Sequence, residues 1–206
     1  LISEEPRILL RYEFQSFLSG DTFDPFLLGA RKNETTSEIS KFSNGVFDKE
    51  ARASITGRDE EFKTEHAILG QNNIDLFQQE KPEVKLRTFE DVVSYYKGGI
   101  PQLIEEILLG IADARQSQAI SKNLERFPAL KSTVMSNLYT IFIAIVHGKI
   151  PNTDKIDDHR HLIEASYCDV FVTEEKQLLN NVQRINPSLT AKKWSDIGKS
   201  IALGRT

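Results

Sequence analysis

The spacing of apolar residues predicts a chain that is mainly helical, with its clearest elements after residue 88. Apolar side chains recur every three to four residues in several stretches, as on one face of a helix. These stretches predict helices over residues 4–18, 48–69, 88–97, 101–111, 120–128 and 130–147, with an exposed polar loop over 31–44. Thr88 is a helix-capping residue, and Pro101 suits the first position of the helix that it opens.

The pattern changes toward the C-terminus. A short helix is predicted over Asp157–Tyr167, followed by the apolar run Val170–Val172, which is too short for a helix. An uninterrupted run of branched and aromatic residues is typical of a strand that is buried on both faces of a parallel sheet. We further expect a helix over 174–180, a second strand over 182–185 and a final helix capped by Thr190. The order of elements predicts a helix-rich α/β fold.

Length and composition narrow the class of protein. The chain has 206 residues, and we expect a helical or irregular N-terminal portion over 1–87 and an α/β core over 88–206. Cys168 is the only cysteine, which excludes an intrachain disulfide and favours a reducing compartment such as the cytoplasm. The longest strongly apolar run, 141–146, is much shorter than the about 20 residues that cross a bilayer, so no membrane association is expected.

Acidic residues are concentrated in one segment. The formal net charge is −4, which does not indicate an extended nucleic-acid-binding surface. Residues 154–175 contain seven acids and two bases and therefore carry −5, which leaves +1 for the remainder of the chain. This local acidity is the first indication of a functional site.

Several acids in this segment are predicted to converge. If Asp158 opens a helix whose buried face carries Leu162, its carboxylate lies near the edge of the sheet. Thr173, Glu174 and Glu175 directly follow the predicted strand. Ligands of open α/β sheets bind beyond the carboxyl ends of the strands, so these residues lie where a site is expected.

Two interpretations of these acids follow from their chemistry. Converging carboxylates repel one another, and Mg²⁺ removes the repulsion with one or two protein carboxylates, waters and a phosphate as ligands. Such a metal can activate a water and stabilise charge on a phosphodiester. In the other interpretation, Asp157 and Asp158 only satisfy a helix N-terminus. Glu174 and Glu175 would then do the same for the helix that follows them.

The stretch 154–179 resembles the C-terminal half of a PIN-domain ribonuclease. That family often shows an Asp, a His three residues later, a small residue one turn on, and then an Asp, an apolar strand ending in Thr, and an acidic pair before Lys. The matching residues are Asp158, His161, Ala165, Asp169, Val170–Thr173 and Glu174–Lys176. The similarity covers about 25 of the 206 residues.

The resemblance implies a Rossmann-like three-layer fold with a parallel sheet, bound Mg²⁺ or Mn²⁺, and hydrolysis of RNA, often by a toxin or defence effector. Carried over by position, Asp158 is the metal ligand on the helix, and Glu175 occupies the acid position after the strand. Thr173 supports a metal-bound water or phosphate. Neighbouring acids that substitute or assist are Asp154, Asp157 and Glu174. An inhibitory protein partner and a homodimer are further expectations.

One part of the family pattern is missing. PIN-domain enzymes carry their first essential Asp in an apolar-Asp-Thr/Ala-Asn pattern at the end of an N-terminal strand, and this sequence lacks it. Either that strand precedes Leu1 or the protein has lost it. Candidates for the middle acid are Glu13, Glu105 and Glu106, the last two preferred. Three functions therefore stay open: a metal-dependent endoribonuclease, a catalytically degenerate module that binds RNA or a protein, and a helical interaction protein.

Overall fold

The structure is a computed structural model that describes residues 6–21, 23, 71, 75, 85–108, 111–149 and 153–197. Within this range, only the backbone is described at 6–8 and 153–157. The loop expected over 31–44 and the helix expected over 48–69 therefore lie outside the described residues, as do the side chains of Asp154 and Asp157.

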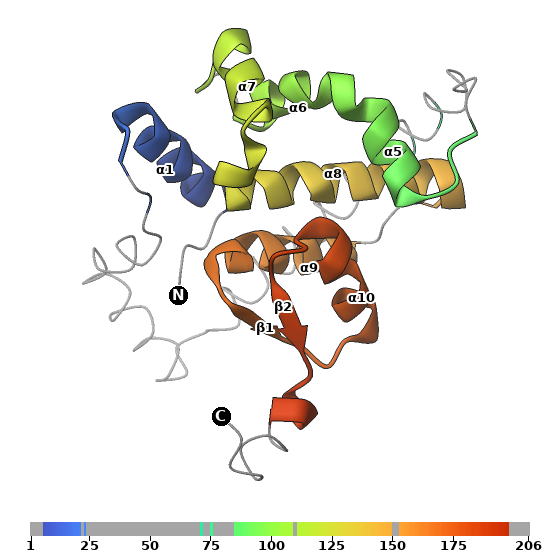
Figure 1. The fold of residues 1–206 in the computed structure, drawn as a ribbon. Helices are drawn as coiled ribbons and strands as arrows, with labels where there is room; N and C mark the ends of the chain where they lie inside the picture. Colours follow the sequence, from blue (N-terminus) through green and yellow to red (C-terminus); the bar gives the residue numbers. More distant parts are fainter. Residues whose placement is uncertain are drawn as a thin grey trace, which may run out of the picture.

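The described part of the chain is a helix-rich α/β structure with one small parallel sheet (Figure 1). Its α-helices are α1 (Pro6–Ser19), α5 (Phe89–Tyr96), α6 (Ile100–Ile107), α7 (Ala114–Ser121), α8 (Pro128–His147), α9 (Thr153–Glu164) and α10 (Lys176–Ile185). Single 3₁₀ turns are η1 (Lys97–Gly99), η2 (Leu124–Arg126) and η3 (Ala165–Tyr167). The strands are β1 (Val170–Val172) and β2 (Thr190–Lys192). The predicted α/β class is confirmed at this level.

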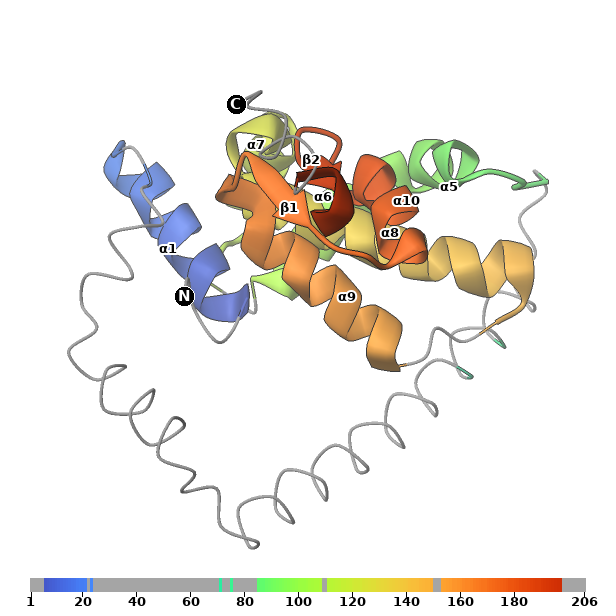
Figure 2. The same cartoon turned by 90° about the horizontal axis from the view of Figure 1, so that it is seen from below.

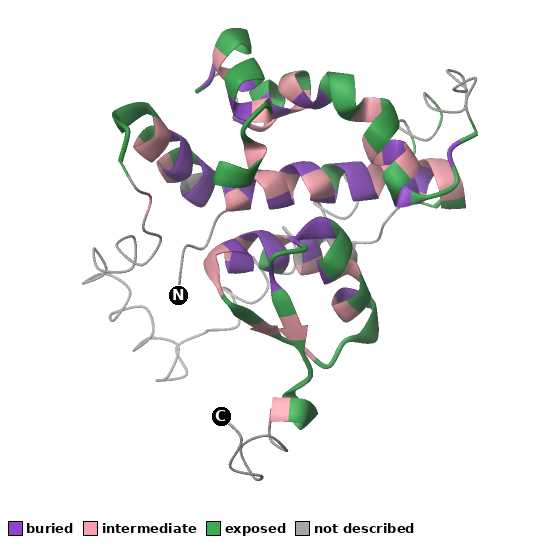
Figure 3. Cartoon of the chain, viewed as in Figure 1, coloured by how far each residue is buried: buried purple, intermediate pink, exposed green. Residues whose placement is uncertain are grey.

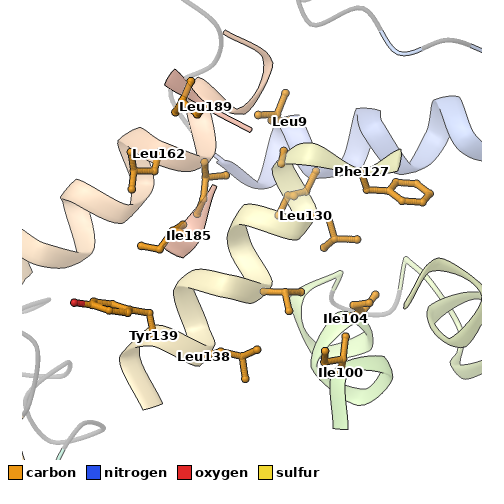
Figure 4. Close-up of a cluster of buried hydrophobic side chains, with 14 of the residues drawn as sticks. Leu9, Ile100, Ile104, Phe127, Leu130, Leu138, Tyr139, Leu162, Ile185 and Leu189 are labelled. Atoms are coloured by element: carbon orange, nitrogen blue, oxygen red, sulfur yellow. The ribbon is translucent and has the colours of Figure 1, made fainter. Parts of the chain in front are cut away.

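Helix α8 is the centre of the hydrophobic core. Helices α1, α5, α6, α9 and α10 all pack against it. Figure 4 shows side chains from α1, α6, α9 and α10 gathered around α8, including Leu9, Ile104 and Ile185. Among the described residues, α8 alone is long and apolar enough to cross a membrane, but half of that span is buried inside the protein, as in a core helix.

The start of α5 shows why the sequence predicted this helix well. The Thr88 hydroxyl accepts a hydrogen bond from the backbone N of Asp91 at 3.1 Å, and the Asp91 carboxylate accepts one from the backbone N of Thr88 at 2.9 Å. This reciprocal pair satisfies two backbone donors that the first turn of a helix leaves without partners. Local chemistry alone therefore fixes where α5 begins.

The two strands form a sheet with one covered and one open face. They pair in parallel, with Val170 beside Thr190, Phe171 beside Ala191 and Val172 beside Lys192. Phe171 packs against the core, whereas Val170 and Val172 are 41% and 39% exposed (Figure 3). The strand at Val170–Val172 is confirmed, but the expectation that both its faces are buried is wrong, because no described element covers the outer face.

The second strand is not where the sequence predicted it. Residues 182–185 belong to α10, in which Leu178, Val182 and Ile185 are buried at helical spacing on one face. The strand is instead Thr190–Lys192, where a helix cap was expected. This segment has no apolar pattern of its own, and its extended form comes from pairing with β1.

Candidate functional site

Asp158 lies inside a helix rather than at its start. Helix α9 begins at Thr153, so Asp158 is in its second turn, and the expectation that Asp158 opens the helix is wrong. The capping interpretation fails for the same reason, because only the first turn has free backbone N–H groups. Leu162, one turn further on, is fully buried, whereas His161 has a side chain that is 60% exposed.

A chain of side-chain contacts connects this part of α9 with α10. The ring of His159, the neighbour of Asp158, packs edge-on against Tyr139 of α8 with 5.4 Å between ring centroids. The Tyr139 hydroxyl donates a hydrogen bond to Asn181 Oδ1 of α10 at 2.8 Å. Figure 2 shows β1 and α10 on the same side of α9. These contacts link α9 to α10 through Tyr139 of α8.

Glu175 occupies the N-cap position of α10 but does not cap it. Its side chain makes no capping hydrogen bond, and its carboxylate has no hydrogen bond or ion pair within the described ranges. The backbone N of Glu175 donates to the Thr173 hydroxyl at 3.1 Å, which fixes the turn between β1 and α10. The carboxylate is exposed at the carboxyl end of β1 and is available to a ligand.

Glu174 has a different neighbour. Its Oε1 accepts a hydrogen bond at 3.0 Å from the backbone N of Ser195, in the helical turn that follows β2. The bond ties the loop after β1 to the segment after β2. Neither Glu174 nor Glu175 therefore caps α10, which removes the capping interpretation for this acidic pair as well.

Asp158 lies on α9 and Glu175 directly precedes α10, two helices that pack against each other, and the described side chains form no larger acidic set around them. The described residues contain no group of three or more His, Cys, Asp or Glu side chains placed to hold a metal. Asp158 and Glu175 match the small number of carboxylates that hydrated Mg²⁺ needs when a phosphate supplies further oxygens. The predicted Mg²⁺ or Mn²⁺ centre stays a prediction. Asp154 and Asp157 lie in the first turns of the same helix.

The candidates for the middle acid do not join Asp158 and Glu175. Glu105 and Glu106 are exposed on α6, a helix that packs against α7 and α8. Glu13 is 3% exposed and lies between α1 and the N-terminus of α8. None of the three contacts the loop after β1 among the interactions of the described residues.

Glu13 forms a buried cluster that sequence analysis did not anticipate. Its Oε1 accepts from the backbone N of Ala129 at 3.1 Å, its Oε2 from that of Leu130 at 3.0 Å, and the Tyr167 hydroxyl also donates to Oε1. The local N-cap residue of α8, Phe127, makes no side-chain cap, so a distant carboxylate takes over that role.

Burial in this cluster changes the pKa values of Glu13 and Tyr167. Burial raises the pKa of Glu13 to about 7 from 4.5, although its three hydrogen bonds act in the opposite direction. Burial and the neighbouring Glu13 carboxylate also raise the pKa of Tyr167. Both oxygens of Glu13 are occupied inside the fold, so this acid stabilises the packing of α1 on α8.

Comparison with known proteins gives little guidance to function. No protein-family model matches the chain, and no solved structure matches it significantly. A 96-residue part of the chain is 26% identical to an ornithine carbamoyltransferase from Thermus thermophilus. That alignment covers 47% of this chain and 32% of the enzyme, so the chain spans about a third of that relative's length.

Proposed function

We propose that the protein is a metal-dependent endoribonuclease of the PIN-like type, which hydrolyses RNA with Mg²⁺ or Mn²⁺ held by Asp158 and Glu175. The observation that carries the proposal is the exposed Glu175 carboxylate directly beyond the carboxyl end of a parallel strand, without a structural partner among the described residues. An exposed acid that neither caps a helix nor forms an ion pair is free to bind a cation.

Each residue of the site has a role that follows from its contacts. Asp158 on α9 and Glu175 directly before α10 would bind the metal. Thr173 accepts a hydrogen bond from the backbone N of Glu175, so its hydroxyl proton can be donated to a water or a phosphate oxygen. A bound divalent ion supplies an activated water and neutralises the charge that develops on the phosphodiester. Asp154 and Asp157, which belong to the same helix as Asp158, would assist.

The finer architecture belongs to the proposal as well. The open face of β1, with Val170 and Val172 exposed, is where a second helical layer of a Rossmann-like three-layer fold would pack. We also infer a cytoplasmic location, an inhibitory protein partner and a toxin or defence role from the PIN resemblance.

A second candidate is favoured by one observation. The described residues hold no group of three or more metal-binding side chains, which suits a degenerate PIN-like module that binds RNA or a protein without cutting it. Such a module would use the same surface but would not need Asp158 for catalysis. The helical interaction protein finds less support, because the structure contains a parallel strand pair.

RNA cleavage in the presence of Mn²⁺ separates the two candidates. The wild-type protein should cut single-stranded RNA, and Asp158→Asn should lose more than about tenfold in rate because it removes a metal ligand. Asp169→Asn is the matched control, since Asp169 is an exposed acid at the opposite end of β1. Equal rates for wild type and Asp158→Asn would rule out the assigned role of Asp158, and an inactive wild type would favour the binding module.

A further inference from the structure

The carboxyl end of β2 places basic and aromatic side chains beside the acidic loop. The backbone N of Thr173 donates to the carbonyl oxygen of Lys192 at 3.1 Å, which continues the parallel pairing past β1. One step further, Glu174 accepts from the backbone N of Ser195 at 3.0 Å. These two bonds bracket Lys193 and Trp194, which therefore lie next to the loop that carries Glu175.

Trp194 stands out among the described side chains by its exposure. It is 68% exposed, the largest exposed fraction among the large hydrophobic residues that the structure describes. Lys192 and Lys193, which precede it, are exposed as well. Figure 1 shows the helical turn of residues 194–197 beyond the end of β2. A single exposed apolar residue is common, so the meaning of Trp194 comes from its neighbours.

We propose that Lys192, Lys193 and Trp194 form a subsite for single-stranded RNA next to the acidic site. The indole ring offers a face on which an unpaired base can stack, and the two ammonium groups can pair with phosphates on either side of that base. A duplex does not fit this subsite, because its base faces are already stacked on each other. The choice of RNA as the polymer rests on the proposed function.

The subsite also answers an electrostatic problem of the acidic site. Glu174, Glu175 and Asp196 are exposed at the same end of the sheet and repel a phosphate chain. Lys192 and Lys193 supply positive charge beside the loop that carries Glu174 and Glu175, so a strand held there would approach the proposed metal-binding carboxylates. Binding should accordingly tighten when a divalent ion neutralises the acids.

The composition of the chain provides a direct probe, because Trp194 is its only tryptophan. Intrinsic tryptophan fluorescence of the full chain, titrated with an oligouridine in EDTA, reports on this ring alone and prevents metal-dependent cleavage. We expect saturable quenching by the single strand and none by a blunt RNA duplex. Absence of quenching by saturating single strand, or equal quenching by the duplex, would overturn the proposal.

Affinity measurements on variants test both parts of the subsite. By fluorescence anisotropy of a labelled oligouridine, Trp194→Ala should bind about tenfold more weakly, which corresponds to one lost stacking contact. Tyr95→Ala is the matched control, because Tyr95 is 48% exposed on α5, away from the sheet. The proposal fails if Trp194→Ala binds like wild type or if both variants lose affinity equally.

The lysines are tested by the dependence of affinity on salt. Lys193→Ala should reduce the slope of log affinity against log salt concentration by about 0.7, the value for one phosphate contact on a single strand. Lys122→Ala, an exposed lysine that follows α7, should leave the slope unchanged. An unchanged slope for Lys193→Ala would remove the phosphate contact from the subsite.

A repeat of the titration with Mn²⁺ and an oligouridine with hydrolysis-resistant linkages, measured against the protein with Mn²⁺ alone, keeps this proposal separate from the nuclease proposal. Tighter binding of the oligouridine with Mn²⁺ supports both the Trp194 subsite and the metal site. Quenching in EDTA that Mn²⁺ does not strengthen would keep the Trp194 subsite and count against the metal site. Loss of quenching under both conditions would reject the subsite, whatever the cleavage assay shows.

Discussion

Two glutamates of this protein, Glu13 and Glu175, have opposite surroundings. Glu13 is 3% exposed, and its two oxygens accept hydrogen bonds from two backbone N–H groups and from Tyr167. Glu175 is exposed, sits at a helix N-cap without capping it, and has no side-chain partner among the described residues. The first carboxylate is fully used by the fold, whereas the second is left available.

The difference teaches how to separate structural acids from candidate functional acids. A buried carboxylate persists only when donors compensate its lost hydration, and each donor then depends on it in return. An exposed carboxylate without donors contributes little to stability. Position in the sequence does not distinguish the two cases, because the sequence offers both Glu13 and Glu175 as candidates for the catalytic site.

Replacement of the buried acid should produce the largest effect. Glu13→Ala leaves two buried backbone N–H groups and the partly buried Tyr167 hydroxyl without their acceptor, and we expect a loss of about 3–5 kcal/mol in the free energy of unfolding. Urea denaturation measures it. Glu106→Ala, an exposed glutamate of α6, should stay within about 0.5 kcal/mol of wild type. A loss for Glu13→Ala as small as that of the control would show that the cluster is not stabilising.

The stability of the wild type should depend on pH through the same group. The pKa of Glu13 is raised from 4.5 in the unfolded chain to about 7 in the fold, so the folded state binds the proton more tightly. The resulting stabilisation is complete below pH about 4.5 and is lost as pH rises through about 7. Between pH 5 and 8 the free energy of unfolding should therefore fall by about 2–3 kcal/mol through this group.

Denaturation of wild type and Glu13→Gln at pH 5 and pH 8 isolates this contribution, since the amide does not titrate. We expect the wild type to lose more stability than the variant between the two pH values. Identical pH dependence in the two proteins would mean that Glu13 ionises normally.

Removal of the hydrogen bond that connects α8 to α10 should reduce the free energy of unfolding by a smaller amount. Tyr139→Phe removes only the hydroxyl that donates to Asn181, and we expect a loss of about 1 kcal/mol in the free energy of unfolding. Asn181→Ala should lower the free energy of unfolding by a similar amount. The double variant should lose less than the sum of the two single losses, because both substitutions break the same hydrogen bond. Strict additivity would contradict the hydrogen bond.

The smallest effect on stability is expected at the exposed acid. Glu175→Gln should change the free energy of unfolding by less than about 0.5 kcal/mol, because the carboxylate makes no described contact. Thermal or urea denaturation without metal measures this. A destabilisation comparable to that of Glu13→Ala would place Glu175 among the structural acids.

The sequence predicted those elements whose determinants are local. The N-terminus of α5 follows from Thr88 and Asp91, which are three residues apart, and α8 from its long apolar stripe. The start of α9 was placed too late, because Thr153, Asp154 and Asp157 all suit a helix start and the sequence does not choose among them, whereas the helix begins at Thr153. The strand β2 could not be predicted, since its extended form depends on pairing with β1. The paired residues are 20 positions apart in the sequence, as in the pair of Val170 and Thr190.

The candidate site was predictable only in part. The position of the acids follows from the apolar strand Val170–Val172, which directly precedes Thr173 and is confirmed. The separate roles of Glu174 and Glu175 depend on Ser195, which lies 21 residues from Glu174. The Glu13 cluster depends on partners 116 and 154 residues away, a distance at which no local pattern gives a signal.

Calorimetric titration of Mn²⁺ tests the central claim, that Asp158 and Glu175 together bind a divalent ion, most directly. The account predicts saturable binding to the wild type and to Asp169→Asn, and loss of that binding in both Asp158→Asn and Glu175→Gln. No saturable binding to the folded wild type, or equal affinity in all four proteins, would contradict it.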